Sequence, residues 1–167
     1  MMQEFDFSKA CEEGVTLGLK RLDESSYFPT MVSSFCETYG NSLSSHTGET
    51  IVVRESLDPL ESLRSCSRNG RSLTRFPFLR EQTLEGPERD EISASLMSAD
   101  GKEIKKVKVF DCVKDRLTGF PCSIEYNGKS VLCNTRQELL EALNQIPAER
   151  SAYIIKGLGL DGKNARA

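Results

Sequence analysis

The stretch that decides the fold is GFPCSIEYNGKSVLCNTRQELLEALNQIPAERSAYII, residues Gly119–Ile155. Within it, Asn127-Gly128 stands between two short segments that are rich in apolar and β-branched residues. This dipeptide is typical of a two-residue type I′ turn, because both central positions of that turn need φ > 0. We therefore expect a β-hairpin with strands near residues 120–126 and 129–133.

A helix and a further strand are expected directly after this hairpin. Thr135 and Glu138 have the spacing of a capping box, in which the two side chains bond each other's backbone amides at the start of a helix. Pro147 is expected to end this helix after Ile146, because an interior proline removes a hydrogen bond. Residues 153–155 then read as a returning strand, which completes a ββαβ unit.

A second hairpin is expected around Asp100-Gly101, with strands at Glu91–Ser98 and Lys102–Cys112. Counting outward from a two-residue turn places Asp90 opposite Asp111. Two like charges in a facing pair are unfavourable unless water or a cation lies between them.

Helices are expected in the N-terminal part. Ser8 can cap a first helix from Lys9 to about Leu22. Its apolar stripe is expected at Cys11, Val15, Leu19 and Leu22. Pro29 suits the first turn of a second helix, which should end near Gly40.

The segments that follow are expected to be shorter. Residues 41–49 read as a polar loop, residues 50–53 as a strand, and residues 58–66 as a brief helix. Residues 71–90 have no clear periodicity, so they form either a long connection or a boundary within the chain.

This order of elements predicts a single α+β domain over residues 1–167, with a possible sub-boundary in residues 71–90. A helical N-terminal part is followed by two β-hairpins, a helix and a strand (ββ-ββαβ). Segregated helices and hairpins are typical of the α+β class, with an antiparallel or mixed sheet.

Composition favours a soluble, cytoplasmic protein that does not cross a membrane. Of its residues, 38% are hydrophobic and 28% charged, and no apolar run approaches the ~20 residues that span a bilayer. The first residues lack the basic and apolar regions of a signal peptide. With one histidine and no Cys-x-x-Cys, the chain has no zinc-site spacing, and we expect neither a metal nor a cofactor.

The six cysteines are expected to stay reduced. The first hairpin places Cys122 opposite Cys133, as two core residues or, alternatively, as a redox pair. Cys11 and Cys36 fall on apolar helix faces, where a cysteine usually behaves as a small buried hydrophobe.

Two sequence patterns suggest a catalytic or a nucleotide-binding site, but neither has the surroundings that such a site needs. His46 is the single histidine, so an enzyme with a histidine base would have to use it, with Cys36 or Cys112 as the nucleophile. The residues beside His46 are small and polar, so they would not bury or orient a base. Residues 157–162 spell G-x-G-x-x-G, yet only five residues follow, too few for the helix that would hold a pyrophosphate. We assign no catalytic residue.

Charge is unevenly distributed along the chain. The segment Ser62–Arg80 holds five arginines and no acidic residue, whereas the remaining 17 Lys and Arg and 25 Asp and Glu give the rest a formal charge of −8. Arginine forms forked contacts to carboxylates and phosphates, and aromatic residues beside it can stack or insert. The expected binding residues are Arg64, Arg68, Arg71, Arg75, Phe76, Phe78 and Arg80.

We therefore expect a non-enzymatic macromolecule-binding protein, such as an adaptor, an inhibitor or an accessory factor. Its expected partner is an acidic surface on another protein, since the negative charge of the whole chain opposes the approach of nucleic acid. Two alternatives stay open: a nucleic-acid-binding accessory protein that uses the same arginines, and a cysteine-dependent enzyme that uses His46.

Overall fold

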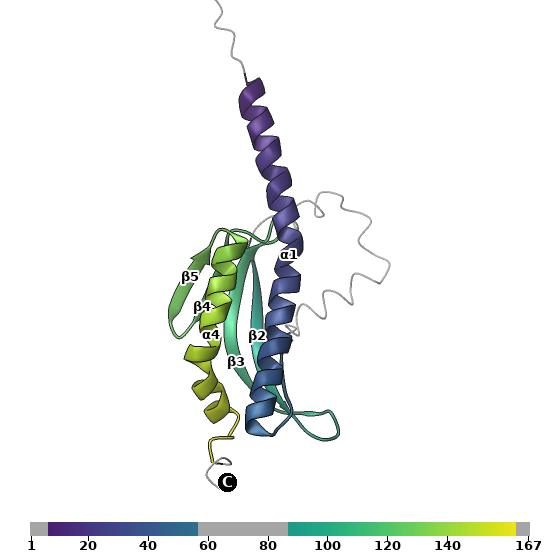
Figure 1. Ribbon diagram of the computed structural model, residues 1–167, viewed down its shortest axis with the longest axis vertical. Coiled ribbons are helices and arrows are strands. Elements are labelled where there is room, and N and C mark those ends of the chain that lie inside the picture. The colour runs from purple at the N-terminus through teal and green to yellow at the C-terminus, as the bar shows by residue number, and fades with distance from the viewer. Residues whose placement is uncertain (1–6, 57–86, 163–167) are drawn as a thin grey trace, which may run out of the picture.

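The computed structural model describes residues 7–56 and 87–162 (Figure 1). The elements in chain order are α1 (Ser8–Thr47), β1 (Ile51–Ser56), β2 (Pro87–Met97), β3 (Glu103–Asp115), β4 (Cys122–Tyr126), β5 (Lys129–Cys133) and α4 (Arg136–Gly157). The strands form one antiparallel sheet in the order β1-β2-β3-β4-β5. Both helices lie on the same face of this sheet (Figure 1). The predicted α+β class is confirmed.

The hairpin of β4 and β5 has the predicted geometry. Asn127 and Gly128 have φ values of 51° and 73°, as a type I′ turn requires. Cys122 faces Cys133 and Ile124 faces Val131, which confirms the predicted register.

The capping box of α4 is also confirmed. The Thr135 hydroxyl accepts a hydrogen bond from the Glu138 amide, and the Glu138 carboxylate accepts one from the Asn134 amide. The predicted end of the helix is wrong, because α4 continues through Pro147 to Gly157, and the predicted strand at residues 153–155 is wrong with it.

Burial explains why α4 continues past its proline. Ile154 and Leu158, both beyond Pro147, are fully or almost fully buried. Burying two such side chains contributes about 3–6 kcal/mol, which exceeds the roughly 3 kcal/mol that an interior proline costs. The expected ββαβ unit is therefore a ββα unit.

The N-terminal part is one helix where we expected two helices and a loop. α1 runs through Pro29 and Gly40 to Thr47, and Phe7 rather than Ser8 is its cap residue. Tyr39 and Leu43, which follow the proline, are buried against the sheet. Gly40 lies where α1 crosses β1, and a Cβ there would come within 3.2 Å of the Val53 amide nitrogen. The glycine therefore permits close packing instead of ending the helix.

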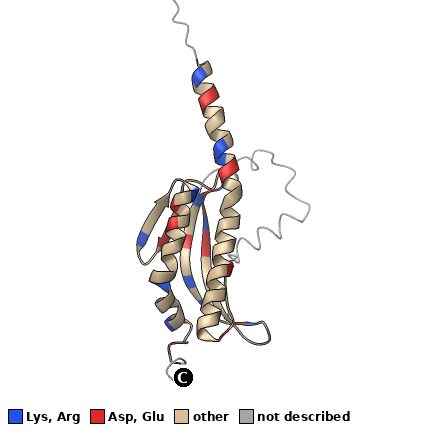
Figure 2. Cartoon of the chain, in the orientation of Figure 1, with Lys and Arg blue, Asp and Glu red and all other residues tan. Residues whose placement is uncertain are grey.

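The first half of α1 extends beyond the sheet (Figure 1). No residue between 7 and 27 is buried, and the first buried residue of the helix is Phe28. Cys11, expected to be buried, is exposed. Bands of positive and negative charge alternate along this part of the helix (Figure 2).

The hairpin of β2 and β3 exists as predicted but differs in detail. Asp100 does not have a positive φ, so the turn is a three-residue connection with Gly101 at φ 74°. Ser93 faces Lys108 whereas Ile92 faces Phe110, so Val109 is an extra residue that forms a β-bulge. Beyond the bulge the register shifts by one.

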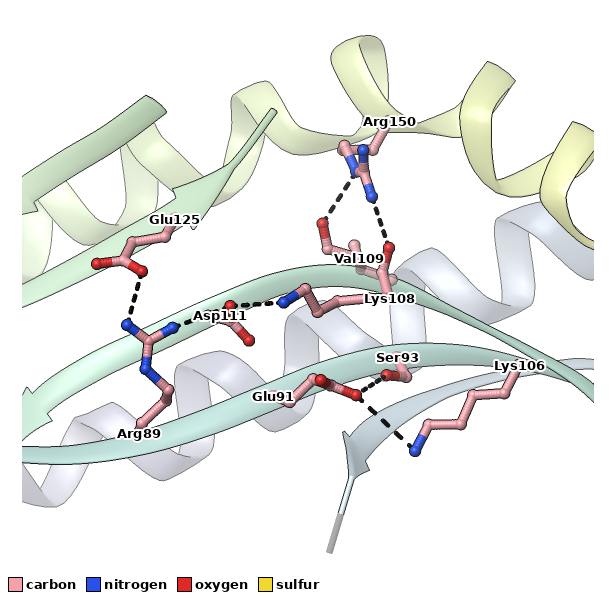
Figure 3. A network of polar contacts seen from close by, with 9 residues as sticks. All are labelled: Arg89, Glu91, Ser93, Lys106, Lys108, Val109, Asp111, Glu125 and Arg150. Carbon is pink, nitrogen blue, oxygen red and sulfur yellow. Dashed lines mark hydrogen bonds and ion pairs between the residues drawn. The ribbon is translucent and has the colours of Figure 1, made fainter. Parts of the chain in front are cut away.

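The shifted register overturns the expected Asp90–Asp111 pair. Asp90 faces Cys112 on the helix-covered face of the sheet, and Asp111 lies on the opposite face. There, Asp111 accepts hydrogen bonds from Arg89 at 3.0 Å and from Lys108 at 2.7 Å (Figure 3). Arg89 also bonds Glu125 at 2.9 Å. Ion pairs thus cover the face of the sheet without helices.

Arg150 of α4 holds the bulge from the other side (Figure 3). Its guanidinium donates to the carbonyl oxygens of Lys108 at 2.6 Å and Val109 at 3.0 Å, and to Asn127 Oδ1 at 2.6 Å. The residue is 7% exposed, and Tyr153 covers its guanidinium at 4.0 Å from the ring centroid. One side chain therefore satisfies two bulge carbonyls and fixes the β4–β5 turn.

Several predictions fall on residues outside the described ranges. The brief helix at residues 58–66, most of the proposed sub-boundary at 71–90 and the whole arginine segment belong to this group. Within the described ranges, no helix combines the length and the apolarity that crossing a membrane requires.

We expect Arg150→Met to lower the free energy of unfolding by about 3 kcal/mol, because it leaves buried acceptors unsatisfied at about 1–3 kcal/mol each. Chemical denaturation monitored by circular dichroism measures the change. Lys156→Met, an exposed position of the same helix, is the control and should change stability little. Equal stability of the two variants would contradict the role of Arg150.

Candidate functional site

A groove of about 570 Å³ lies between α1 and the start of the sheet. Its walls are largely apolar, with Phe28 and Val32 from α1 and Ile51, Val53 and Ile92 from β1 and β2. β1 is an edge strand, and five consecutive residues of it, 51–55, border the groove. Side chains of both strand faces therefore line the groove, which wraps around the edge of the sheet.

A charged cluster forms one end of this groove. Glu55 of β1, Asp90 of β2 and Lys114 of β3 all line it. The Lys114 ammonium lies 2.5 Å from Asp90 Oδ2 and 3.8 Å from Glu88 Oε2. It also lies 5.0 Å from the centroid of the Phe28 ring, so α1 covers the cluster. We call these four residues, Glu55, Glu88, Asp90 and Lys114, the acidic end of the groove.

The pKa shifts indicate an excess of negative charge at the acidic end. Partial burial, and then the neighbouring Asp90 carboxylate, raise the pKa of Glu55. Burial by itself lowers the pKa of Lys114, but the hydrogen bond and the charge of Asp90 outweigh it, so its pKa is raised. Three carboxyl groups thus surround one ammonium. A second cation would relieve the repulsion between Glu55 and Asp90.

The groove holds two thiols, Cys36 and Cys112. Burial, with the Glu55 carboxylate, raises the pKa of Cys36 to about 11. Cys112 is also buried. A reactive thiol needs a positive neighbour or a base that stabilises the thiolate, and at Cys36 the Glu55 carboxylate does the opposite. The Cys36 thiol is therefore a poor nucleophile.

His46 lies elsewhere, beside a second cavity of about 470 Å³ between α1 and α4. It belongs to the last turn of α1 rather than to a loop, and its Nδ1 lies 2.8 Å from the Ser42 carbonyl oxygen. Ten residues of helix, about 15 Å along the axis, separate it from Cys36. A hydrogen bond between these two side chains is therefore impossible.

The facing cysteines of the β4–β5 hairpin are free thiols of the core. The hydrogen bond that Cys122 shares with Cys112, followed by burial, raises the pKa of Cys122. Burial likewise raises the pKa of Cys133. Thiols that hold their protons react slowly, which fits the interpretation as core residues.

Two further sequence motifs find no site. The G-x-G-x-x-G run begins at Gly157, the last residue of α4, and so follows a helix where the dinucleotide fingerprint follows a strand. Across residues 7–56 and 87–162, no group of three His, Cys, Asp or Glu side chains could hold a metal ion.

The expected binding residues, Arg64, Arg68, Arg71, Arg75, Phe76, Phe78 and Arg80, all lie outside the described residues. The residues of the groove were not identified from the sequence. One signal was present: the expected Asp90–Asp111 pair required water or a cation, and in the structure the cation Lys114 lies beside Asp90.

Comparisons of this chain with family models, with curated proteins and with solved structures found no match. The function must therefore be argued from the geometry alone.

We expect labelling of the native protein with iodoacetamide to modify Cys11 first among the described cysteines, because Cys36, Cys112, Cys122 and Cys133 are buried. Peptide mass spectrometry after timed labelling measures each rate. His46→Ala should change none of these rates, and urea should expose all four buried thiols. A buried cysteine that reacts as fast as Cys11, and slows in His46→Ala, would support the enzyme alternative instead.

Proposed function

We propose that this chain is a non-enzymatic protein that binds another protein, as an adaptor, an inhibitor or an accessory factor. The observation that supports this function is the apolar groove with its acidic end. We infer that the groove takes a segment of a partner chain that carries apolar side chains beside a lysine or an arginine.

The shape and the charge of the groove both favour such a segment. The groove follows five consecutive residues of an edge strand of the described sheet, as a site for an extended segment of a partner chain would. Apolar side chains of the partner would cover Val32 and Val52, and its cation would lie near Glu55. Charge complementarity of this kind sets specificity and the rate of association.

The arginine segment is a second surface of the same proposed function. We propose that Arg64, Arg68, Arg71, Arg75 and Arg80 contact carboxylates of a partner protein while Phe76 and Phe78 insert into its surface. Nucleic acid is the alternative ligand for these arginines. The five free thiols of the described residues fit a reducing compartment, and we propose a cytoplasmic location.

The groove is tested with a fluorescein-labelled peptide in which leucine alternates with arginine, and with a matched peptide in which glutamate replaces arginine. We expect the first peptide to bind and the second not to bind. Glu55→Lys should weaken binding of the first peptide at least about tenfold, because it reverses the charge beside Asp90. Fluorescence anisotropy gives both affinities.

Glu141→Lys is the matched control for this experiment, because it makes the same change of net charge on an exposed position of α4 that does not line the groove. Equal losses in Glu55→Lys and Glu141→Lys would show that net charge alone draws the peptide. The proposed groove function would then be wrong.

The arginine segment is tested separately, by exchange of Arg68, Arg71 and Arg75 to Glu and, in a second variant, of Phe76 and Phe78 to Ala. If the segment binds a protein, both variants should lose the same captured proteins in quantitative mass spectrometry, since aromatic residues usually dominate such interfaces. Binding of a labelled single-stranded oligonucleotide, with steep salt dependence and loss only in the arginine variant, would favour nucleic acid instead.

A further inference from the structure

The chain leaves β1 and re-enters the sheet at β2 beside the acidic end of the groove. β1 ends at Ser56, directly after Glu55, and β2 begins at Pro87, directly before Glu88. In the register of these two strands, β2 extends beyond the end of β1. The connection, residues 57–86, is therefore joined at both ends to residues that neighbour the carboxylates of the acidic end.

One part of this connection has the chemistry that the groove favours. Residues 75–80 read Arg-Phe-Pro-Phe-Leu-Arg, and so combine apolar side chains with an arginine, as the proposed function requires of a ligand. Successive side chains of an extended chain point to opposite sides. In an extended form, Phe76, Phe78 and Arg80 would share one side, and Leu79 would lie on the other. Both sides would carry apolar surface.

The groove offers a surface to both sides of such a segment. Glu55 lies on the face of β1 that α1 covers, where Val32 of α1 also lines the groove, and neither residue is fully buried. Val52 lines the groove from the opposite face of β1 and is 36% exposed. An arginine beside Glu55 would also offset the repulsion between its carboxylate and that of Asp90.

The connection is long enough to place residues 75–80 in the groove. The chain from Arg80 to Pro87 can reach about 23 Å, whereas residues 51–55 of β1 span about 13 Å. A tether of this kind corresponds to an effective concentration of about 1 mM. If a separate peptide bound with a dissociation constant of about 0.1 mM, the same contact within the chain would be about 90% formed.

We propose that residues 75–80 dock into the groove of their own chain, with Arg80 beside Glu55 and the phenylalanines against the apolar lining. This inference rests on the proposed function, since it assigns a segment of the chain to the site proposed for a partner. The groove of the free chain is then occupied, and a partner segment must displace residues 75–80. A partner whose acidic surface binds the arginines would free the groove, so the two proposed surfaces are coupled.

Docking is measured without a partner, through the reactivity of a cysteine placed in the groove. The probe is Val52→Cys in a background of Cys11→Ser and Cys66→Ser, alkylated with iodoacetamide and followed by mass spectrometry. Phe76→Ala combined with Phe78→Ala, which changes no charge, should raise the alkylation rate about fivefold. A tenfold weaker contact would lower the occupied fraction from about 90% to about 50%, and so raise the open fraction by that factor.

Arg80→Glu should also raise the alkylation rate. Its matched control is Lys102→Glu, which makes the same change of charge at an exposed position that does not line the groove. Equal effects of these two substitutions, or no effect of the phenylalanine substitutions, would overturn the proposal. Slower alkylation at higher protein concentration would also refute it, because the segment of a second copy would then occupy the groove.

The leucine–arginine peptide separates this inference from the proposed function of the groove. Chains with Phe76→Ala and Phe78→Ala should bind the peptide about fivefold more tightly than the wild type, because less of the groove is occupied. Equal affinities for the two chains would support the groove as a partner site and overturn docking. If neither chain binds the peptide while the alkylation rates still differ, the docked segment is supported and the partner site is refuted.

Discussion

The β-bulge at Val109, held by the buried guanidinium of Arg150, is the constraint on which the rest of the structure depends. A one-residue shift of register exchanges the two faces of a strand. Because of the bulge, Lys114 faces α1 and meets Asp90, while Asp111 turns away toward Arg89. Without this bulge, Lys114 and Asp111 would exchange faces and Asp90 would lie opposite Asp111. Arg150 bonds the carbonyl oxygens of Lys108 and Val109, so α4 fixes this irregularity and, through it, the acidic end of the groove.

Local signals in the sequence predicted the parts of the fold that local chemistry decides. Asn127-Gly128 specifies its turn because only residues that tolerate positive φ fit there, and the Thr135 capping box satisfies amides of its own helix. Both signals act within a few residues. The predicted helix start at Pro29 and the predicted helix ends near Gly40 and before Pro147 failed, because those residues lie inside longer helices that the sheet stabilises. The cost of a proline is local, whereas the burial that outweighs it comes from residues far away in the sequence.

The groove could not be predicted in the same way. Glu55, Asp90 and Lys114 come from three strands, and a count from the turn of β2 and β3 places Asp111, rather than Cys112, opposite Asp90 unless the bulge is known. No residue near Val109 in the sequence indicates the bulge, because Arg150, whose side chain bonds the Val109 carbonyl oxygen, lies 41 residues later in the chain.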